Sequence, residues 1–195
     1  MPQVYVTNFN PRFTGVSATA AAVLAEQARH LDVALVGHPL PGCPAPISRA
    51  QALKLSRHAP AGLPFAIWHV RRNPEMQLAL LARDGLRLPI RIVFTSAAQR
   101  RHSAWPRWLI SRMDAVIATT DLAASFVPGV QAVVPHGVDV ARFHPAADRS
   151  AAWAATGFPG DYGIAAVGRI RPEKGTDLFV SAMIRALPQL PGATA

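Results

Sequence analysis

The feature that most constrains the fold is an alternation of short apolar, β-branched runs with helical segments. The first two runs, 4–7 and 33–36, enclose a helix that we expect to begin near Ser17, with Gly15 in the turn before it. Strand, glycine turn, helix and strand make the βαβ unit of a parallel sheet. Further runs follow at 65–70, 90–95, 115–119 and 131–134. The sequence therefore predicts one open α/β domain with a parallel sheet over residues 1–135.

A turn-rich joint, which we place at 136–160, precedes a second unit at 161–195. Residues 163–168 form a near-continuous apolar run, typical of a strand buried on both faces. Thr176 is a candidate cap for a helix whose apolar residues recur at helical spacing. Because one strand and one helix cannot bury a core alone, we expect 161–195 to be the beginning of a second domain that is incomplete here.

Composition narrows the class of protein. Half of the 195 residues are hydrophobic (50%) and only 16% are charged, which excludes intrinsic disorder of the whole chain. No apolar run reaches the length of a spanning helix, and the N-terminus lacks the pattern of a signal peptide. The single Cys43 cannot form an internal disulfide, and no Cys/His cluster has zinc spacing. We expect a cytoplasmic globular protein without a metal site.

The chain is strongly basic, with a formal net charge of +9. Lys54 and Lys174 are its only lysines, so nearly all of the positive charge is guanidinium. The planar fork of arginine suits phosphate and carboxylate, and polyanionic partners follow as one interpretation: nucleic acid, a membrane surface or phosphorylated substrates. The other interpretation is a compositional preference for arginine over lysine, and both stay open.

A glycine-bracketed loop, 168–176, carries the strongest local signal. It joins the apolar run to the predicted helix and contains Arg169 and Lys174. A helix N-terminus at the carboxyl end of a parallel strand binds anions, and two cations beside it suit a diphosphate. The spacing matches neither a P-loop nor a G-x-G-x-x-G fingerprint. The alternative is an ordinary turn with solvated charges.

Several segments of the chain resemble motifs of a known protein family. Residues 134–139, followed by Phe143 and Pro145, resemble the interdomain segment of family 4 retaining glycosyltransferases with the GT-B fold, and 167–175 resemble their donor-diphosphate loop. Segments 67–76, 94–103 and 112–119 look like those of alphaproteobacterial lipopolysaccharide core mannosyltransferases. The resemblance covers essentially the whole chain, and the family is longer. It implies a Rossmann-like N-terminal, acceptor-side domain followed by the beginning of a Rossmann-like, nucleotide-sugar-binding domain.

The resemblance also implies roles for individual residues. Arg169 and Lys174 would neutralise the diphosphate of a nucleotide sugar as it leaves, and Gly15 would let the backbone approach that diphosphate. An anionic acceptor would be bound at the ends of the parallel strands by His69, Arg71, Arg72, Arg100 and Arg101. The alternative for His69 is a structural histidine, and the alternative for the arginine pairs is solvated surface.

Two positions depart from the family pattern. Many members carry a catalytic histidine just after the fourth strand, where this chain has Ser96 and Ala97. His102 is the candidate for that catalytic role, although it is offset in sequence. The two glutamates, seven residues apart, that hold the ribose and the sugar would lie beyond Ala195. We therefore expect weak transfer, or none, from these 195 residues alone.

The resulting hypothesis is transfer of mannose from GDP-mannose to lipopolysaccharide core with retention of configuration. It requires no metal and no cofactor besides the nucleotide sugar. The acceptor would be a lipid-linked anionic saccharide, and the basic chain would contact the cytoplasmic face of the inner membrane peripherally. One alternative is another GT-B donor and acceptor, such as UDP-glucose and exopolysaccharide. Another is a non-catalytic nucleic-acid-binding module, disfavoured because the arginines are spread over several loops.

Overall fold

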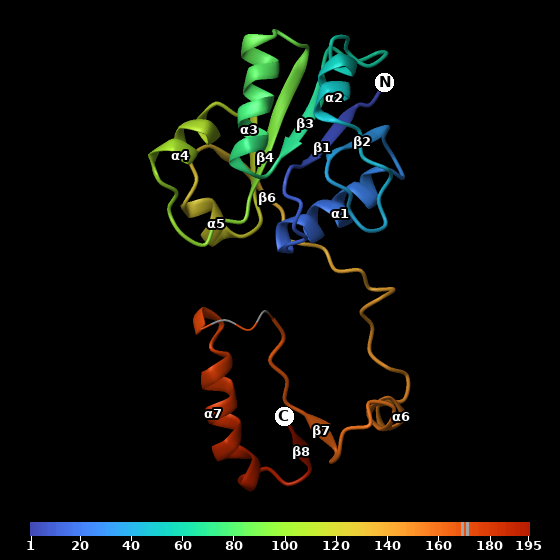
Figure 1. Ribbon diagram of the computed structural model, residues 1–195, viewed down its shortest axis with the longest axis vertical. Helices are drawn as coiled ribbons and strands as arrows, with labels where there is room; N and C mark the ends of the chain where they lie inside the picture. The colour runs from blue at the N-terminus through green and yellow to red at the C-terminus, as the bar shows by residue number, and fades with distance from the viewer. Residues whose placement is uncertain (169, 171) are drawn as a thin grey trace. The chain divides into compact units, whose positions relative to one another are not determined.

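The computed structural model describes residues 1–168, 170 and 172–195, and the chain forms two compact units, Met1–Gly137 and Val138–Ala195 (Figure 1). The first unit contains a 6-stranded sheet in the order β2-β1-β3-β4-β5-β6, with every neighbouring pair parallel. The strands are β1 Val4–Asn8, β2 Val33–Gly37, β3 Ala66–Val70, β4 Ile90–Ser96, β5 Ala115–Ala118 and β6 Val130–Val133. The predicted parallel α/β fold is confirmed.

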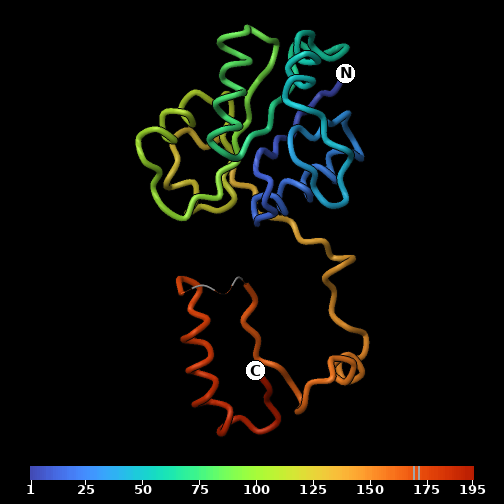
Figure 2. Tube along the Cα trace, viewed as in Figure 1, coloured from blue at the N-terminus to red at the C-terminus, as the bar shows by residue number. Residues whose placement is uncertain are grey.

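Helices connect successive strands, and the chain can be followed through them in Figure 2. They are α1 Gly15–Gln27, α2 Arg49–Leu55, α3 Asn73–Leu80 with a π-helical turn at Leu81–Gly85, α4 Ala104–Ser111 and α5 Asp121–Ser125. Alternate residues of each strand face opposite sides of the sheet. Val4 and Val6 pack in one cluster with Leu24 of α1, whereas Tyr5 and Trp68 pack in the other, which includes residues of α2, α3 and α4.

The order of the strands reverses between β1 and β3. From β1 the chain crosses to β2 on one side, and from β2 it returns to β3 on the other side of β1. In open parallel sheets the crevice that binds ligands lies beyond the carboxyl ends of the strands at this switch point. The segments that leave β1 and β3 there lead into Gly15 of α1 and Asn73 of α3.

The second unit holds much less structure. It contains α6 Arg149–Ala154, β7 Tyr162–Gly163 paired with β8 Ala193–Thr194, and α7 Thr176–Ala186. The predicted buried strand 163–168 is wrong beyond its first residue, since Val167 is 98% exposed. Among the described residues of this unit, two short strands and two helices provide no second layer against which that apolar run could pack.

Local chemistry sets the boundaries of three helices. Helix α4 begins at Ala104, because Ser103 occupies the N-cap position and Pro106 lies in the first turn, where a missing N–H does no harm. Helix α3 ends at Leu80 and widens into the π-helical turn. The N-cap of α7 is Gly175 in a left-handed conformation (φ 68°), not Thr176, which is the first helical residue.

Within the residues that the structure describes, no helix has both the length and the apolar composition needed to cross a membrane.

Candidate functional site

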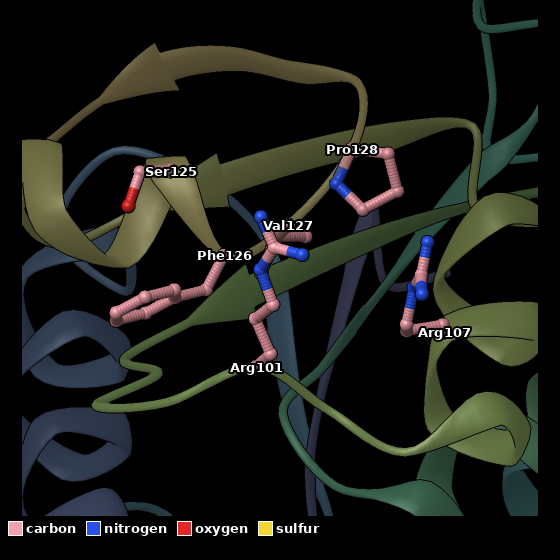
Figure 3. A pocket seen from close by; sticks show the side chains of 6 residues that line it. All are labelled: Arg101, Arg107, Ser125, Phe126, Val127 and Pro128. Atoms are coloured by element: carbon pink, nitrogen blue, oxygen red, sulfur yellow. The ribbon is translucent and has the colours of Figure 1, made fainter.

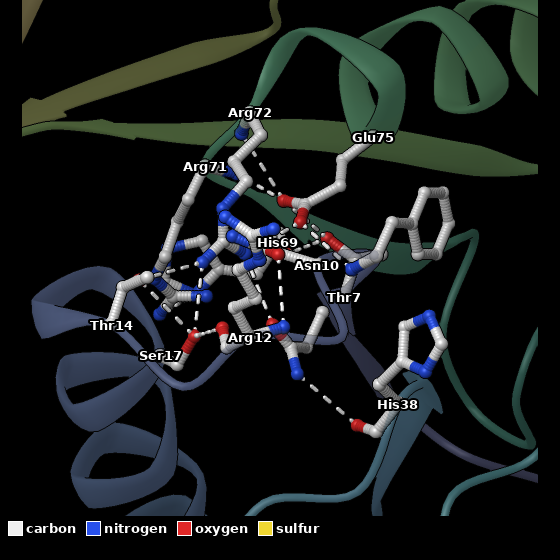
Figure 4. Close-up of polar contacts among 12 residues, drawn as sticks. Thr7, Asn10, Arg12, Thr14, Ser17, His38, His69, Arg71, Arg72 and Glu75 are labelled. Carbon is white, nitrogen blue, oxygen red and sulfur yellow. Dashed lines mark hydrogen bonds and ion pairs between the residues drawn. The ribbon is translucent and has the colours of Figure 1, made fainter.

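A buried carboxylate organises the switch point of the sheet. Glu75, in the first turn of α3, is 0% exposed. Its two oxygens accept hydrogen bonds from the backbone N–H groups of Phe9 (3.1 Å), Arg71 (2.8 Å) and Arg72 (3.2 Å) and from the Thr7 hydroxyl (3.0 Å). A buried charge is stable only when it is paired and fully hydrogen-bonded. Glu75 therefore ties the segment after β1 to the segment after β3 (Figure 4).

Arg72 supplies the opposite charge. Its guanidinium donates to Glu75 Oε1 (3.1 Å) and to Asn8 Oδ1 (3.0 Å). The other terminal nitrogen donates to Thr14 Oγ1 (3.3 Å) and to Ser17 Oγ (3.0 Å), at the beginning of α1. Since each terminal nitrogen already has protein acceptors, Arg72 fixes the loop that precedes α1 relative to β3 (Figure 4).

Arg71 differs sharply from its neighbour. Its Nε and Nη1 atoms are buried and have no hydrogen-bond partner in the part of the chain that the structure describes. Its Nη2 lies 3.4 Å from Nδ1 of His69. Burial lowers the pKa of Arg71 to about 10, with Glu75 opposing that change and Arg72 adding to it. The guanidinium remains charged at neutral pH, so two of the three nitrogens of a buried cation lack acceptors.

His69 supports that guanidinium as a neutral ring. Burial, and then the charge of Arg71, lower the pKa of His69 to about 3. Nδ1 faces the donor Nη2 of Arg71, so it is assigned as the acceptor, and Nε2–H then donates to Thr95 Oγ1 at 2.7 Å. Both ring nitrogens are thereby occupied, which favours a positioning role over acid–base chemistry.

Gly15 is the first residue of α1. A Cβ added to it would meet no atom within 4 Å, and its backbone is not left-handed. Neither conformation nor packing within the described chain therefore requires glycine here. The helix has no acidic residue in its first turn and no side-chain cap from Thr14, so its N-terminal N–H groups and partial positive charge remain available.

The loop after β4 carries the other predicted residues of this unit. Nε2 of His102 is buried without a hydrogen-bond partner among the described residues. Arg100 and Arg101 are exposed. Arg101 lines a cavity of about 240 Å³ together with Arg107 of α4 and with residues 125–128 (Figure 3). Ser96, which stands where the family pattern has histidine, accepts a hydrogen bond from the Ala98 N–H at 3.3 Å.

Of the predicted diphosphate residues in the second unit, Lys174 is exposed and immediately precedes Gly175, the N-cap of α7. Arg169 lies outside the described residues. Among the residues that are described, no group of three or more His, Cys, Asp or Glu side chains is arranged to hold a metal ion.

A second charged cluster lies at the opposite edge of the sheet. Asp114 precedes β5 and pairs with Arg83 (2.6 Å) and Arg91 (2.7 Å). It also accepts the Ile92 N–H at 2.8 Å, and these contacts hold the pKa of Asp114 below its usual value although burial opposes them. Because Asp114 stands at the amino end of its strand, this cluster is structural.

The structure thus brings His69, Arg71 and Arg72 together around a residue that the sequence analysis did not select. Glu75 belongs to segment 67–76, which carries the family resemblance, but the sequence assigns it no role. The available signal was its position, N3 of a helix whose first turn contains Pro74, where glutamate commonly accepts the N-cap N–H.

Proteins of similar sequence show the family to which the chain belongs. The chain is 45% identical over 188 residues to the lipopolysaccharide core biosynthesis mannosyltransferase LpcC of Rhizobium leguminosarum bv. viciae, covering 96% of this chain and 53% of that protein. It is 41% identical over 191 residues to LpsB of Rhizobium meliloti (strain 1021), a protein of the same description, covering 97% of this chain and 54% of the relative. The chain is a homologue of lipopolysaccharide core mannosyltransferases.

This homologue spans about half the length of the curated relatives it matches. No family model matches the sequence. The fold is similar to that of Anabaena Alr3699/HepE, solved in complex with UDP and glucose, with a TM-score of 0.76 at 10% identity over 100% of this chain and 60% of that one. The resemblance drawn from the sequence motifs and the GT-B type α/β fold are both confirmed.

Proposed function

We propose that this chain is the acceptor-binding part of a retaining mannosyltransferase that transfers mannose from GDP-mannose to lipopolysaccharide core. The observation that carries the proposal is the Arg71 guanidinium at the topological switch point, whose Nε and Nη1 atoms are buried without an acceptor. Guanidinium N–H groups bind carboxylate and phosphate oxygens, so these donors suit an anionic group on the acceptor saccharide, which would have to displace the atoms that cover them.

The surrounding residues hold the Arg71 guanidinium in place. His69 faces Nη2 of Arg71 as a neutral acceptor, and Glu75 accepts the Arg71 backbone N–H. Arg72 supports the loop before α1, and the predicted binding role of His69 and Arg72 becomes one of positioning. Arg100 and Arg101 remain predicted acceptor-side residues on the loop after β4, and His102 on the same loop remains the candidate for the catalytic role.

The donor side of the proposal rests on the turn that contains Gly15 and on the loop that contains Arg169 and Lys174. The open space at Gly15 and the uncapped N-terminus of α1 suit a phosphate group. Lys174, with Arg169, would stabilise the negative charge of the departing diphosphate, which in turn would help deprotonate the acceptor hydroxyl on the same face. The scheme needs no metal ion.

The test uses a chimera in which this chain is completed with the C-terminal half of the R. leguminosarum relative. We expect mannose transfer from GDP-mannose to a lipid A-linked core saccharide, and much less hexose transfer from UDP-glucose. Arg71→Met should raise the acceptor KM about a hundredfold, because a charged hydrogen-bonding pair is lost.

Stability separates this loss from misfolding. Removing a buried guanidinium that lacks acceptors should leave the free energy of unfolding unchanged or raise it. Arg91→Gln, on the opposite edge of the sheet, is the matched control and should leave the acceptor KM unchanged. Equal effects of the two substitutions, or preference for UDP-glucose, would overturn the respective parts of the proposal.

A further inference from the structure

Helix α4 turns two tryptophans outward. Its Leu109 and Ile110 are buried in the core, whereas Trp105 and Trp108 are 53% and 52% exposed. The two indole rings stack on each other, with centroids 5.1 Å apart and planes 13° from parallel. Large aromatic side chains placed together on a surface mark an interaction site, and indole favours boundaries between apolar and aqueous phases.

Two arginines without counterions belong to the same part of the chain: Arg107 lies between the tryptophans in the sequence of α4, and Arg101 precedes the helix. Arg101 and Arg107 line the cavity of about 240 Å³, with Phe126 and Pro128 among its walls (Figure 3). In the part of the chain that the structure describes, no carboxylate oxygen lies within 4.0 Å of either guanidinium, whereas Arg112, just past the end of the helix, is 3.7 Å from Asp84. The cavity therefore combines uncompensated positive charge with an apolar wall.

We propose that Trp105, Trp108, Arg101 and Arg107, here called the tryptophan–arginine surface, bind the headgroup region of an anionic phospholipid membrane. The guanidinium groups would bind lipid phosphates, for which their planar fork is suited, and the stacked indoles would enter the interface beside them. An exposed basic and aromatic helix face of this kind gains affinity from both apolar burial and electrostatic attraction.

Two other occupants fit less well. A second copy of this chain would bring another +9 charge against the same arginines. Single-stranded nucleic acid uses open aromatic faces for base stacking, but here each indole covers one face of the other. The inference deepens the proposed function, on which it rests for the lipid-linked acceptor, and it recasts Arg101 as a contact to the surface that carries the acceptor.

The experiment measures co-sedimentation of the 195-residue chain with vesicles of phosphatidylglycerol and phosphatidylcholine, compared with phosphatidylcholine alone. We expect binding to the anionic vesicles that weakens steeply with added salt. Arg101→Gln with Arg107→Gln should weaken it about thirtyfold, from two basic residues near the surface. Trp105→Ala with Trp108→Ala should weaken it about tenfold or more.

The matched control is Lys54→Gln with Arg57→Gln, which removes the same charge from exposed residues at a different cavity of unit 1. This control should bind vesicles nearly as well as the unchanged chain. Quenching of tryptophan fluorescence by brominated lipid gives a second readout. Trp68 is 0% exposed and Trp153 lies in the second unit, so Trp153→Phe serves as the background in which Trp105→Ala with Trp108→Ala should abolish the quenching.

Equal losses in the control and the arginine variant would show nonspecific charge attraction and overturn the proposal. So would equal binding to neutral vesicles, a tryptophan-dependent oligomer without lipid, or competition by an oligonucleotide that depends on the same residues. Vesicle binding needs no sugar transfer, so its failure is distinguishable from failure of the proposed function.

Discussion

Two arginine pairs, Arg71–Arg72 and Arg100–Arg101, follow neighbouring strands of one parallel sheet, and the sequence gives them the same appearance. The structure treats them differently. Arg72 is bonded to a buried glutamate and Arg71 is largely buried beside a neutral histidine, whereas Arg100 and Arg101 are exposed. Both pairs were predicted to bind an anionic acceptor.

The difference originates in the helix that follows each pair. Helix α3 carries Glu75 in its first turn, and that carboxylate draws the preceding backbone and Arg72 into the core. Helix α4 has no acidic residue in its first turn, so nothing draws Arg100 or Arg101 inward. One carboxylate therefore decides whether an arginine pair becomes a preorganised site or an exposed cationic surface.

Removing that carboxylate should have the largest effect on the comparison. Glu75→Ala leaves three backbone N–H groups and the Arg72 guanidinium without their acceptor, and we expect the free energy of unfolding to fall by about 3–5 kcal/mol. Denaturant-induced unfolding measures this free energy. The matched control is Glu26→Gln, an exposed glutamate that also pairs with an arginine three residues away, and it should cause no measurable change.

Replacing an arginine by alanine should lower the free energy of unfolding less than removing Glu75 does, and by unequal amounts in the two pairs. Arg72→Ala removes hydrogen bonds to four side chains and should cost about 2–3 kcal/mol of folding stability. Arg101→Ala removes an exposed side chain and should stay within about 0.5 kcal/mol. If the two variants unfolded at the same denaturant concentration, the contrast between buried and surface arginines would be wrong.

His69 should make stability depend on pH, because its pKa lies near 3 in the folded chain and near 6.5 when unfolded. Between those values the unfolded chain binds a proton that the folded chain does not. The free energy of unfolding should therefore fall as the pH drops from 6.5, by at most about 1.4 kcal/mol per pH unit. His69→Asn should flatten this dependence between about pH 6.5 and 5. An unchanged slope would mean that His69 can be protonated in place.

Gly15→Ala should also change folding stability little. The added methyl group meets open space at the start of a helix, so the free energy of unfolding should stay within about 1 kcal/mol and rise rather than fall. In the chimera the same substitution should raise the donor KM, because the methyl group would project where the diphosphate is proposed to lie. A fall in stability with an unchanged donor KM would remove Gly15 from the proposed site.

Much of the first unit could be predicted from the sequence. The runs near Val4, Val33 and Ile90 are short, apolar and bounded by turn residues, so local pattern and burial point to the same structure. The residues that follow β3 and β4 could be placed at one edge of the sheet, because the carboxyl ends of parallel strands lie together. In the second unit, by contrast, 163–168 has the pattern of a buried strand but no second layer to bury it, and pattern alone could not predict that exposure.

The sequence by itself determined the parallel α/β architecture and the edge of the sheet at which arginine and histidine gather, because period and turn chemistry are local properties. Only the tertiary structure decided which of these side chains are buried. Glu75 accepts hydrogen bonds from Thr7 and Phe9, which lie 68 and 66 positions away in the sequence, and no local pattern encodes such contacts. Those contacts confine Arg72 and leave Nε and Nη1 of Arg71 without an acceptor, so the candidate site is a product of long-range packing.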